Sequence, residues 1–374
     1  MSRISIVHAI LMSASLASGA SHSSNYIVYI GTYGKGVYAY QFDADSGKLE
    51  SKGLVGEVVN PSFLACDRDY KFLYAASELE GHVNGAVASF AIDRKSGSLK
   101  FLNSVSSGGV SPCHLVVDHT RRMVMVANYG TGGVSAYPID HDGRLGEMSS
   151  LMTTQGSSEN PERQRGPHAH EVVLSPDNRF AYVPDLGLDQ IRIFRLDPAH
   201  AKLAQNDPPF VKEDPGFGPR HMAFSPNGKY AYVVNELKSF VTVFSTGGSP
   251  GAWKQIQKVS TLPEGFSEEN APAEIEVDHP GKYLYSSNRG PGTIAVFAID
   301  SGNGTLRQLQ IAKTGGTVPR GMQLDPTGRF LFAGDQKSNQ FVVFKVDPSS
   351  GQLTLTGQSF EAPSPVSFLF VPQS

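Results

Sequence analysis

Five polar side chains of this 374-residue chain have the chemistry to bind and transform a small anion. They are His170, Arg220, Glu236, Arg289 and Arg320. An imidazole titrates near neutral pH and can exchange a proton with a substrate, and arginines form paired, charge-assisted hydrogen bonds with carboxylates or phosphates. A glutamate can hold the arginines in place or tune the imidazole. If the fold brings them together, the five residues predict a site for a small carboxylated or phosphorylated molecule.

The elements that carry these residues belong to a phrase that recurs along the chain. It consists of a proline, a short apolar strand, a Ser-Pro-type turn and an aromatic-rich strand that ends in Asn or Asp. Examples are "GPRHMAFSPNGKYAYVVNELKSFVTVF" (218–244) and "VPRGMQLDPTGRFLFAGDQKSNQFVVF" (318–344). The marker prolines are 46–55 residues apart: Pro61, Pro112, Pro167, Pro219, Pro272, Pro319 and Pro365. A period near fifty residues made only of strands is typical of a β-propeller with one four-stranded blade per repeat.

The two ends of the chain supply complementary parts of one more blade. "SPVSFLFV" (364–371) matches a first strand, and "YIVYIGTYGKGVYAYQFD" (26–43) matches the second and third strands of a blade that lacks its first. We therefore predict an all-β fold, a seven-bladed β-propeller, in which residues 365–371 pair beside the 26–31 strand and leave no open edge. No linker supports two domains, so residues 21–374 are expected to form one.

Aligning the repeats on their turns places two variable slots at one rim of the central channel. The first slot holds Ser62, Cys113, His170, Arg220, Ala273 and Arg320, and the second, after the end of the second strand, holds Glu78, Tyr129, Leu186, Glu236, Arg289 and Gln336. The residue just before the second slot is Asn, Asp or Ser in every repeat and is predicted to form a turn with its own backbone. Packing requires uniform residues, so the variable slots indicate a site.

Other polar residues near the slots are weaker candidates. Arg320, His168, Glu78, Tyr129 and Gln336 are predicted to contact a substrate. His114 and His221 follow the first slot, so strand alternation predicts that they face away from the channel and are structural. The alternative for the whole set is a solvated polar rim in which Arg–Glu pairs fill the channel. No spacing requires a metal or another cofactor, and we expect none.

The bulk composition limits the partners. The formal net charge of −3 offers no basic surface for nucleic acid, and no stretch after the N-terminus approaches the ~18 apolar residues of a membrane span. Residues 1–20, with Arg3, an apolar run and Ala20, have the layout of a secretory signal peptide. We therefore predict a secreted protein, with a disordered tail and a cytoplasmic location as the alternative.

Two smaller features complete the pattern. Asn303-Gly304-Thr305 is a glycosylation sequon in a predicted turn, so Asn303 is the expected acceptor. Cys66 and Cys113 fall at different heights on neighbouring strands, which argues against a disulfide bond.

Four segments carry a resemblance to a known family. "GPHAHEVVLSPDNRFAYVPDLG", "GPRHMAFSPNGKYAYVVNEL", "SNRGPGTIAVFAID" and "YIGTYGKGVYAYQFD" resemble the seven-bladed propeller lactonase family, which contains propeller-type 6-phosphogluconolactonases and fungal 3-carboxy-cis,cis-muconate lactonizing enzyme. The resemblance implies a site made of His170, Arg220, Glu236 and Arg289. The family often continues "SNRG" with a His-Asp pair, where this chain has Pro291-Gly292-Thr293.

The residues and the resemblance together predict an enzyme that forms or opens a lactone of an anionic organic acid at the channel mouth. It would be carboxymuconate cyclase-like or 6-phosphogluconolactonase-like. Arg220 and Arg289 would hold the anion, and His170 would protonate carbon in the closing direction or activate water in the opening direction. The alternatives are a secondary-metabolism cyclase with a changed substrate and a secreted, non-catalytic binding propeller.

Overall fold

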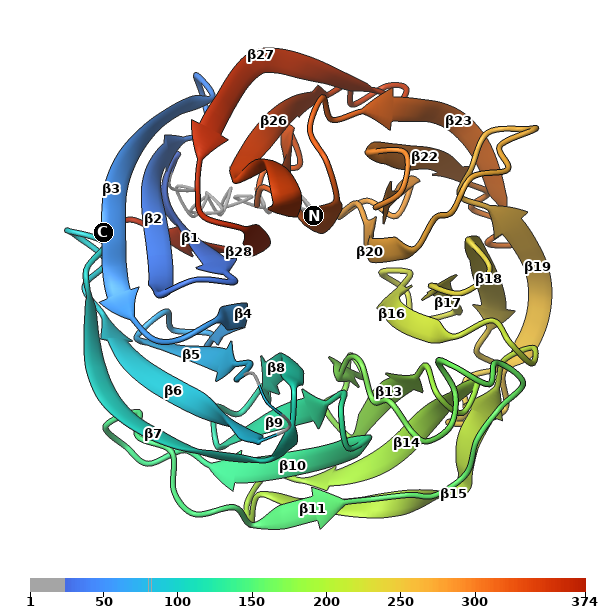
Figure 1. The fold of residues 1–374 in the computed structure, drawn as a ribbon, viewed down its shortest axis with the longest axis horizontal. Helices are drawn as coiled ribbons and strands as arrows, with labels where there is room; N and C mark the ends of the chain where they lie inside the picture. The colour runs from blue at the N-terminus through green and yellow to red at the C-terminus, as the bar shows by residue number, and fades with distance from the viewer. Residues whose placement is uncertain (1–23, 80, 82) are drawn as a thin grey trace, which may run out of the picture.

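Seven four-stranded sheets stand around a central axis (Figure 1). The structure is a computed structural model that describes residues 24–79, 81 and 83–374. Among these residues the only helix is a single 3-10 turn, η1 (Gln336–Ser338). The predicted all-β, seven-bladed propeller is therefore confirmed, whereas the predicted signal peptide lies outside the described residues.

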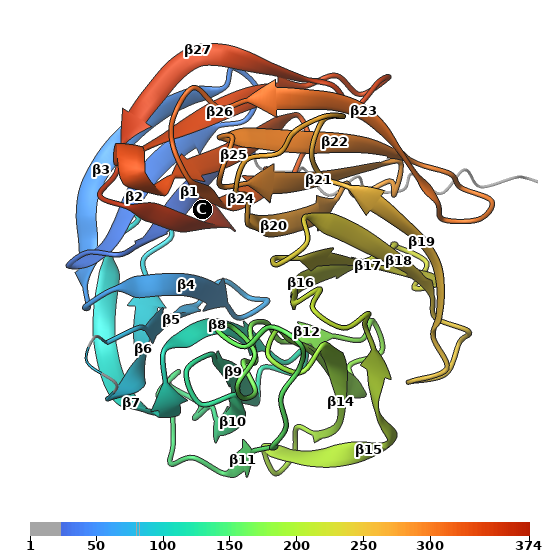
Figure 2. The ribbon, with the colours of Figure 1, turned by 45° about the vertical axis from the view of Figure 1, so that its right-hand side comes forward.

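Each blade runs from an inner strand at the channel to an outer strand at the periphery (Figures 1 and 2). Blade 1 contains β28 (Pro365–Pro372), β1 (Asn25–Thr32), β2 (Gly36–Asp43) and β3 (Lys48–Glu57). Blade 2 contains β4 (Pro61–Cys66), β5 (Phe72–Ser77), β6 (Asn84–Ile92) and β7 (Leu99–Val110). Blade 3 contains β8 (Pro112–Val117), β9 (Met123–Asn128), β10 (Gly133–Pro138) and β11 (Ser150–Met152).

The remaining four blades follow in chain order. Blade 4 contains β12 (Val173–Leu174), β13 (Phe180–Asp185), β14 (Gln190–Asp197) and β15 (Lys202–Lys212). Blade 5 contains β16 (Pro219–Phe224), β17 (Tyr230–Asn235), β18 (Phe240–Ser245) and β19 (Lys254–Ser260). Blade 6 contains β20 (Pro272–Val277), β21 (Tyr283–Asn288), β22 (Thr293–Ile299) and β23 (Leu306–Lys313). Blade 7 contains β24 (Pro319–Leu324), β25 (Phe330–Asp335), β26 (Gln340–Val346) and β27 (Leu353–Glu361).

The ring closes within blade 1, as predicted. Strand β28 pairs antiparallel with β1 from Tyr26 opposite Pro372 to Thr32 opposite Pro365, so the last strand becomes the innermost one of the first blade. Aromatic side chains of blades 7 and 1 pack across this join, with Phe42 against Phe332 at 5.1 Å between ring centroids. Edge-to-face packing of this kind adds to the stabilisation from burying apolar area.

A β-bulge recurs at the start of every inner strand. In blade 5, Pro219 lies opposite Asn235 and His221 opposite Val234, so Arg220 is an extra residue in the ladder. The residues of the first variable slot occupy this bulge in each blade, and the same irregularity continues in β28. Because an extra residue interrupts the alternation of sides, the bulged residue and the one after it can both face the channel.

The uniform Asn, Asp or Ser position ties neighbouring blades together. Asn128 donates from Nδ2 to the carbonyl of Ser107 in blade 2 (3.1 Å), and Asn288 donates to the carbonyl of Thr261, just beyond blade 5 (2.8 Å). The predicted bond to its own turn is present at Asp185, which accepts from the amide of Gly187 at 3.2 Å. In most blades, therefore, the prediction of a local turn was wrong, since the side chain bonds to the outer strand of the preceding blade or to the residues that directly follow it.

Three further expectations can be compared with the described residues. Cys66 and Cys113 are both free, so the expectation of no bridge is confirmed. No helix in the described part of the chain has the length and apolarity needed to cross a bilayer. Asn303 is exposed in the turn between β22 and β23, and its side-chain oxygen accepts from the hydroxyl of Thr305 at 2.6 Å.

Candidate active site

Glu236 is the centre of a cluster of ion pairs at one end of the channel. Its carboxylate lies 3.1 Å from Nε of Arg220 and 2.6 Å from Nη2 of Arg289, and its other oxygen accepts from Nη2 of Arg163 at 2.7 Å. These four residues, which we call the mouth cluster, come from blades 5 and 6 and from the connection before β12. The structure thus brings together three of the five residues of the sequence prediction and adds Arg163.

The arginines keep this carboxylate ionised. Burial alone would raise the pKa of Glu236, but Arg289 and Arg220 outweigh burial and lower it to about 2. Burial lowers the pKa of Arg289 to about 10, because the opposing pull of Glu236 compensates for it only in part. With three guanidinium groups around one carboxylate, the mouth cluster keeps excess positive charge for an incoming anion.

Arg320, on β24, belongs to a second chain of contacts, which it forms with residues of blades 1 and 2. It donates to the hydroxyl of Tyr33 at 3.1 Å and lies over the same ring at 5.5 Å. The Tyr33 hydroxyl in turn donates to Glu78 at 2.6 Å. Glu78, predicted to contact substrate, instead holds Tyr33 and through it Arg320.

His170 lies on the bulge of blade 4 and is 4% exposed. Its ring lies edge-on to Tyr129 (5.3 Å between centroids) and to His221 (5.2 Å), and the Cys113 thiol donates to its carbonyl at 3.2 Å. Burial, then the charge of Arg220, lowers the pKa of His170 well below its usual range. The imidazole is therefore neutral at neutral pH and free to accept a proton.

His168 and Tyr129 form a stacked pair beside the mouth cluster. The rings are 4.5 Å apart and nearly parallel, Nδ1 of His168 lies 2.8 Å from the carbonyl of Tyr129, and the Tyr129 hydroxyl accepts from Arg163 at 3.1 Å. Through this hydroxyl the pair positions Arg163. The partly buried Gln336 belongs to the wall of the adjoining cavity.

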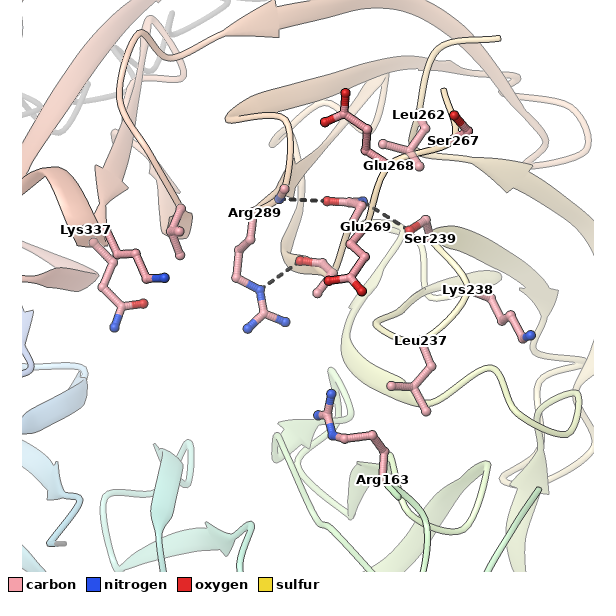
Figure 3. Close-up of a pocket in the computed structure, with 15 residues that line it drawn as sticks. Arg163, Leu237, Lys238, Ser239, Leu262, Ser267, Glu268, Glu269, Arg289 and Lys337 are labelled. Carbon is pink, nitrogen blue, oxygen red and sulfur yellow. Dashed lines mark hydrogen bonds between the residues drawn. The ribbon is translucent and has the colours of Figure 1, made fainter. Parts of the chain in front are cut away.

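An open cavity of about 880 Å³ adjoins the mouth cluster. Figure 3 shows Arg163 and Arg289 at its inner side, pointing toward one another, with Lys337 across from them. Arg289 is anchored there, because its Nε donates to the carbonyl of Ala271 at 2.8 Å. The cavity thus offers room for a drug-sized molecule and cationic groups at the end nearest the channel.

Below the mouth lies a second group of titratable residues, the deep cluster: His114, Glu171, His221 and Glu274. Nδ1 of His221 is 2.8 Å from Glu274 and 3.9 Å from Glu171, and Nε2 of His114 is 3.7 Å from Glu171. The prediction that His114 and His221 face away from the channel was wrong. The bulge cancels the expected alternation, so Arg220 and His221, which are consecutive, line the same small cavity.

Burial dominates the electrostatics of the deep cluster. It raises the pKa of Glu274 to about 7, and burial together with Glu274 raises the pKa of Glu171 well above its usual range. Burial, then the charge of Arg220, lowers the pKa of His221 well below its usual range. No group of three or more His, Cys, Asp or Glu residues in the described ranges is arranged to hold a metal ion.

Sequence reasoning missed Arg163, Tyr33 and Glu274. Arg163 lies in the long connection of residues 153–172, outside the aligned phrase, where only the pair of arginines in "PERQRG" gave a signal. Tyr33 follows β1, in the blade that the alignment could not complete. Glu274 directly follows the first slot of its repeat, the position at which strand alternation predicted that the histidines of other repeats face away from the channel.

Comparison with known proteins agrees with this architecture. The family model for the lactonase seven-bladed β-propellers matches residues 27–370. The chain is 34% identical over 354 residues to the 6-phosphogluconolactonase of Bacillus subtilis (strain 168), covering 94% of this chain and 99% of that protein. It is 31% identical over 291 residues to the 6-phosphogluconolactonase of Formosa agariphila, covering 77% and 81%. The periplasmic gluconolactonase of Pseudomonas aeruginosa is similar in structure, with a TM-score of 0.88, 33% identity, and 94% of this chain and 100% of that chain covered.

Proposed function

Because this chain belongs to the lactonase family of seven-bladed β-propellers, we propose that it hydrolyses an anionic lactone at the mouth of its channel. The observation that carries the proposal is the convergence of Arg163, Arg220 and Arg289 on the single carboxylate of Glu236, beside an open cavity. One carboxylate cannot neutralise three guanidinium groups, so the mouth has positive charge to offer a substrate.

The proposed substrate is a sugar-type lactone with a carboxylate or phosphate. Two relatives are named 6-phosphogluconolactonase and a structural neighbour gluconolactonase, so the gluconolactones are the first compounds to test. Arg289, which lines the cavity, would bind the anion. The turn Pro291-Gly292-Thr293 beside it contributes no charged side chain, so recognition of the anion falls to the arginines.

His170 is the proposed proton-transfer group. Opening a lactone requires that water lose a proton and that the ring oxygen gain one. A neutral imidazole has an unprotonated ring nitrogen that can take part in proton transfer, and His170 lies between Tyr129 at the mouth and His221 in the channel. Arg220 supplies positive charge for the oxyanion that forms as the carbonyl is attacked.

The buried acid–base groups beside the cationic pocket argue against a purely binding propeller, because a binding protein needs no such groups.

Export and glycosylation at Asn303 complete the proposal. The proposal of export rests on the signal-like segment 1–20, and the proposal of glycosylation rests on the exposed sequon. N-terminal sequencing and intact mass of protein from its native source test both: an intact Met1 or Ser2 start refutes export by this route, and an unmodified Asn303 refutes glycosylation.

The test of function is acid release from lactones by purified protein in a pH-stat. We expect the 6-phosphate of D-glucono-δ-lactone to be opened faster than its spontaneous hydrolysis and in preference to the neutral, unphosphorylated lactone. Arg289→Ala should raise the KM for the phosphorylated lactone about 10-fold or more, since a charge-assisted bond contributes about 1.5–3 kcal/mol. A parallel assay with muconates, followed by loss of conjugated absorbance, tests the cyclase alternative. Turnover of muconates without turnover of any lactone would overturn the proposal.

A further inference from the structure

The channel below the mouth contains a histidine whose second nitrogen has no protein partner. His221 is 3% exposed, and its Nδ1 lies 2.8 Å from Oε1 of Glu274. Its Nε2 has no hydrogen-bond partner within residues 24–79, 81 and 83–374. A buried polar atom without a partner is unfavourable, so its retention calls for a ligand.

His221 lines a cavity of about 10 Å³, which is large enough for one water molecule. Arg220, Arg320 and Ser62 line the same cavity, so a water there has several polar partners besides the imidazole. An isolated apolar void would stay dry, whereas this one meets the requirement of two to four polar neighbours. The two guanidinium groups also favour hydroxide over water at this point.

We propose that the His221–Glu274 pair activates a water held in this cavity as the nucleophile of the lactonase reaction. This inference rests on the proposed function and assigns its base. With Glu274 ionised, Nδ1–H of His221 donates to the carboxylate, and Nε2 is left as the acceptor that faces the water. The arrangement is a histidine oriented by a buried carboxylate, as in other enzymes that deprotonate a nucleophile.

The step balances without any further reactant. Water gives one proton to Nε2 of His221, and its oxygen forms a bond to the lactone carbonyl carbon. The bond from that carbon to the ring oxygen then breaks, and the electron pair stays on the ring oxygen. The ring oxygen takes up the proton by way of His170, whose ring centroid is 5.2 Å from that of His221. The product acid then ionises and releases one proton to solvent.

The charge on Glu274 controls the base. Several groups surround the imidazole: Glu274, Glu171, Glu236, His114, His170, Arg220, Arg289 and Arg320. Burial and the arginines lower the pKa of His221, and the charge of Glu236 raises it. Since burial raises the pKa of Glu274 to about 7, the ionised form of the pair, and with it kcat, is expected to increase as pH rises through 7.

The experiment compares kcat, KM and their pH profiles for the wild type, His221→Ala and Glu274→Gln. We expect His221→Ala to lower kcat ~10²–10⁴-fold with KM changed less than about threefold, as for loss of a general base. Glu274→Gln should lower kcat ~10–10²-fold and move the acidic limb to lower pH, because the carboxyl that titrates near pH 7 is gone and only the imidazole remains. Glu276→Gln is the matched control: it lies on the same strand and is partly buried, but its carboxylate accepts from the amide of Leu324 at 2.6 Å and from Gln323.

Retention of wild-type kcat by His221→Ala, or a fall in kcat for Glu274→Gln with an unmoved limb, would overturn the proposal. A wild type that opens no lactone would overturn the proposed function instead. A crystal structure gives a readout that does not depend on activity. We expect an ordered water 2.6–3.2 Å from Nε2 of His221. A protein group on Nε2, or a cavity that holds no water, would rule out this water site.

Discussion

Glu236 and Glu274 are two glutamates on neighbouring blades, and their surroundings shift their pKa values in opposite directions. Glu236 lies among three arginines, which overcome its burial and lower its pKa to about 2. Glu274 faces a neutral imidazole instead, and burial raises its pKa to about 7. The number of guanidinium groups in contact, rather than depth, decides which carboxylate is permanently charged. In the proposed function, the mouth therefore binds the substrate, and the deep cluster moves protons at neutral pH.

The largest difference between the two carboxylates is expected in stability. Glu236→Ala leaves three arginines without their shared partner, and breaking a buried ion pair by removing one member is unfavourable by about 3–5 kcal/mol. Glu274→Gln replaces a carboxyl that is half-protonated near pH 7 by a neutral group of the same shape, so its change should stay below about 1 kcal/mol. Urea unfolding at pH 7 measures both. Equal losses would show that the two carboxylates do not differ as described.

The next effect concerns the residue between the two clusters. His170→Ala should lower the rate of lactone opening ~10²–10⁴-fold, which is typical of losing a group that transfers protons. His200, exposed in the turn that follows β14 and paired with Asp197, provides the control. His200→Ala is expected to leave kcat unchanged. Full activity of His170→Ala on a substrate of the wild type would refute the assignment.

The contributions of Glu236 and of a third carboxyl, that of Glu276, to stability are expected to depend on pH in opposite ways. Burial raises the pKa of Glu276 to about 8 from its ordinary 4.5, so the folded state binds a proton that the unfolded state has lost. Its contribution to stability is complete below pH 4.5 and is lost as pH rises to about 8. That of Glu236 runs the other way and is lost as pH falls from 4.5 to about 2. Compared with wild type, Glu276→Gln should therefore gain in relative stability between pH 4.5 and 8, measured by thermal unfolding. A constant difference across this range would contradict the shift.

The smallest effect is expected at the solvent side of the mouth. The side chain of Arg163 is 42% exposed, so water and salt screen its pair with Glu236. Arg163→Ala should raise KM about two- to fivefold and leave kcat nearly unchanged. Arg165→Ala, two residues away and exposed, is the matched control and should change neither. A loss of kcat in Arg163→Ala would place this arginine in the chemistry.

The sequence predicted the fold almost completely, because each blade repeats the same strands and turns and the ends complement each other. It also identified Arg220, Glu236 and Arg289, whose slots vary while the neighbouring Asn, Asp or Ser does not. It failed where the backbone departs from regular alternation. The extra residue in each inner strand lets Arg220 and His221 face the same cavity. No residue type in the sequence predicts such a bulge. Arg163 was missed because contacts from long connections leave no periodic signal.

Because β28 closes blade 1, the first blade can be completed only when synthesis of the chain ends. Strand β1 emerges early from the ribosome, but its inner partner is made only after the other six blades. At ~5–20 residues per second, an interval of more than 300 residues lasts on the order of 20–70 s. During that time β1 presents an unpaired edge, the feature that other chains can bind in aggregation. A nascent chain of this protein is therefore a client for chaperones until its last strand is released, however stable the finished ring.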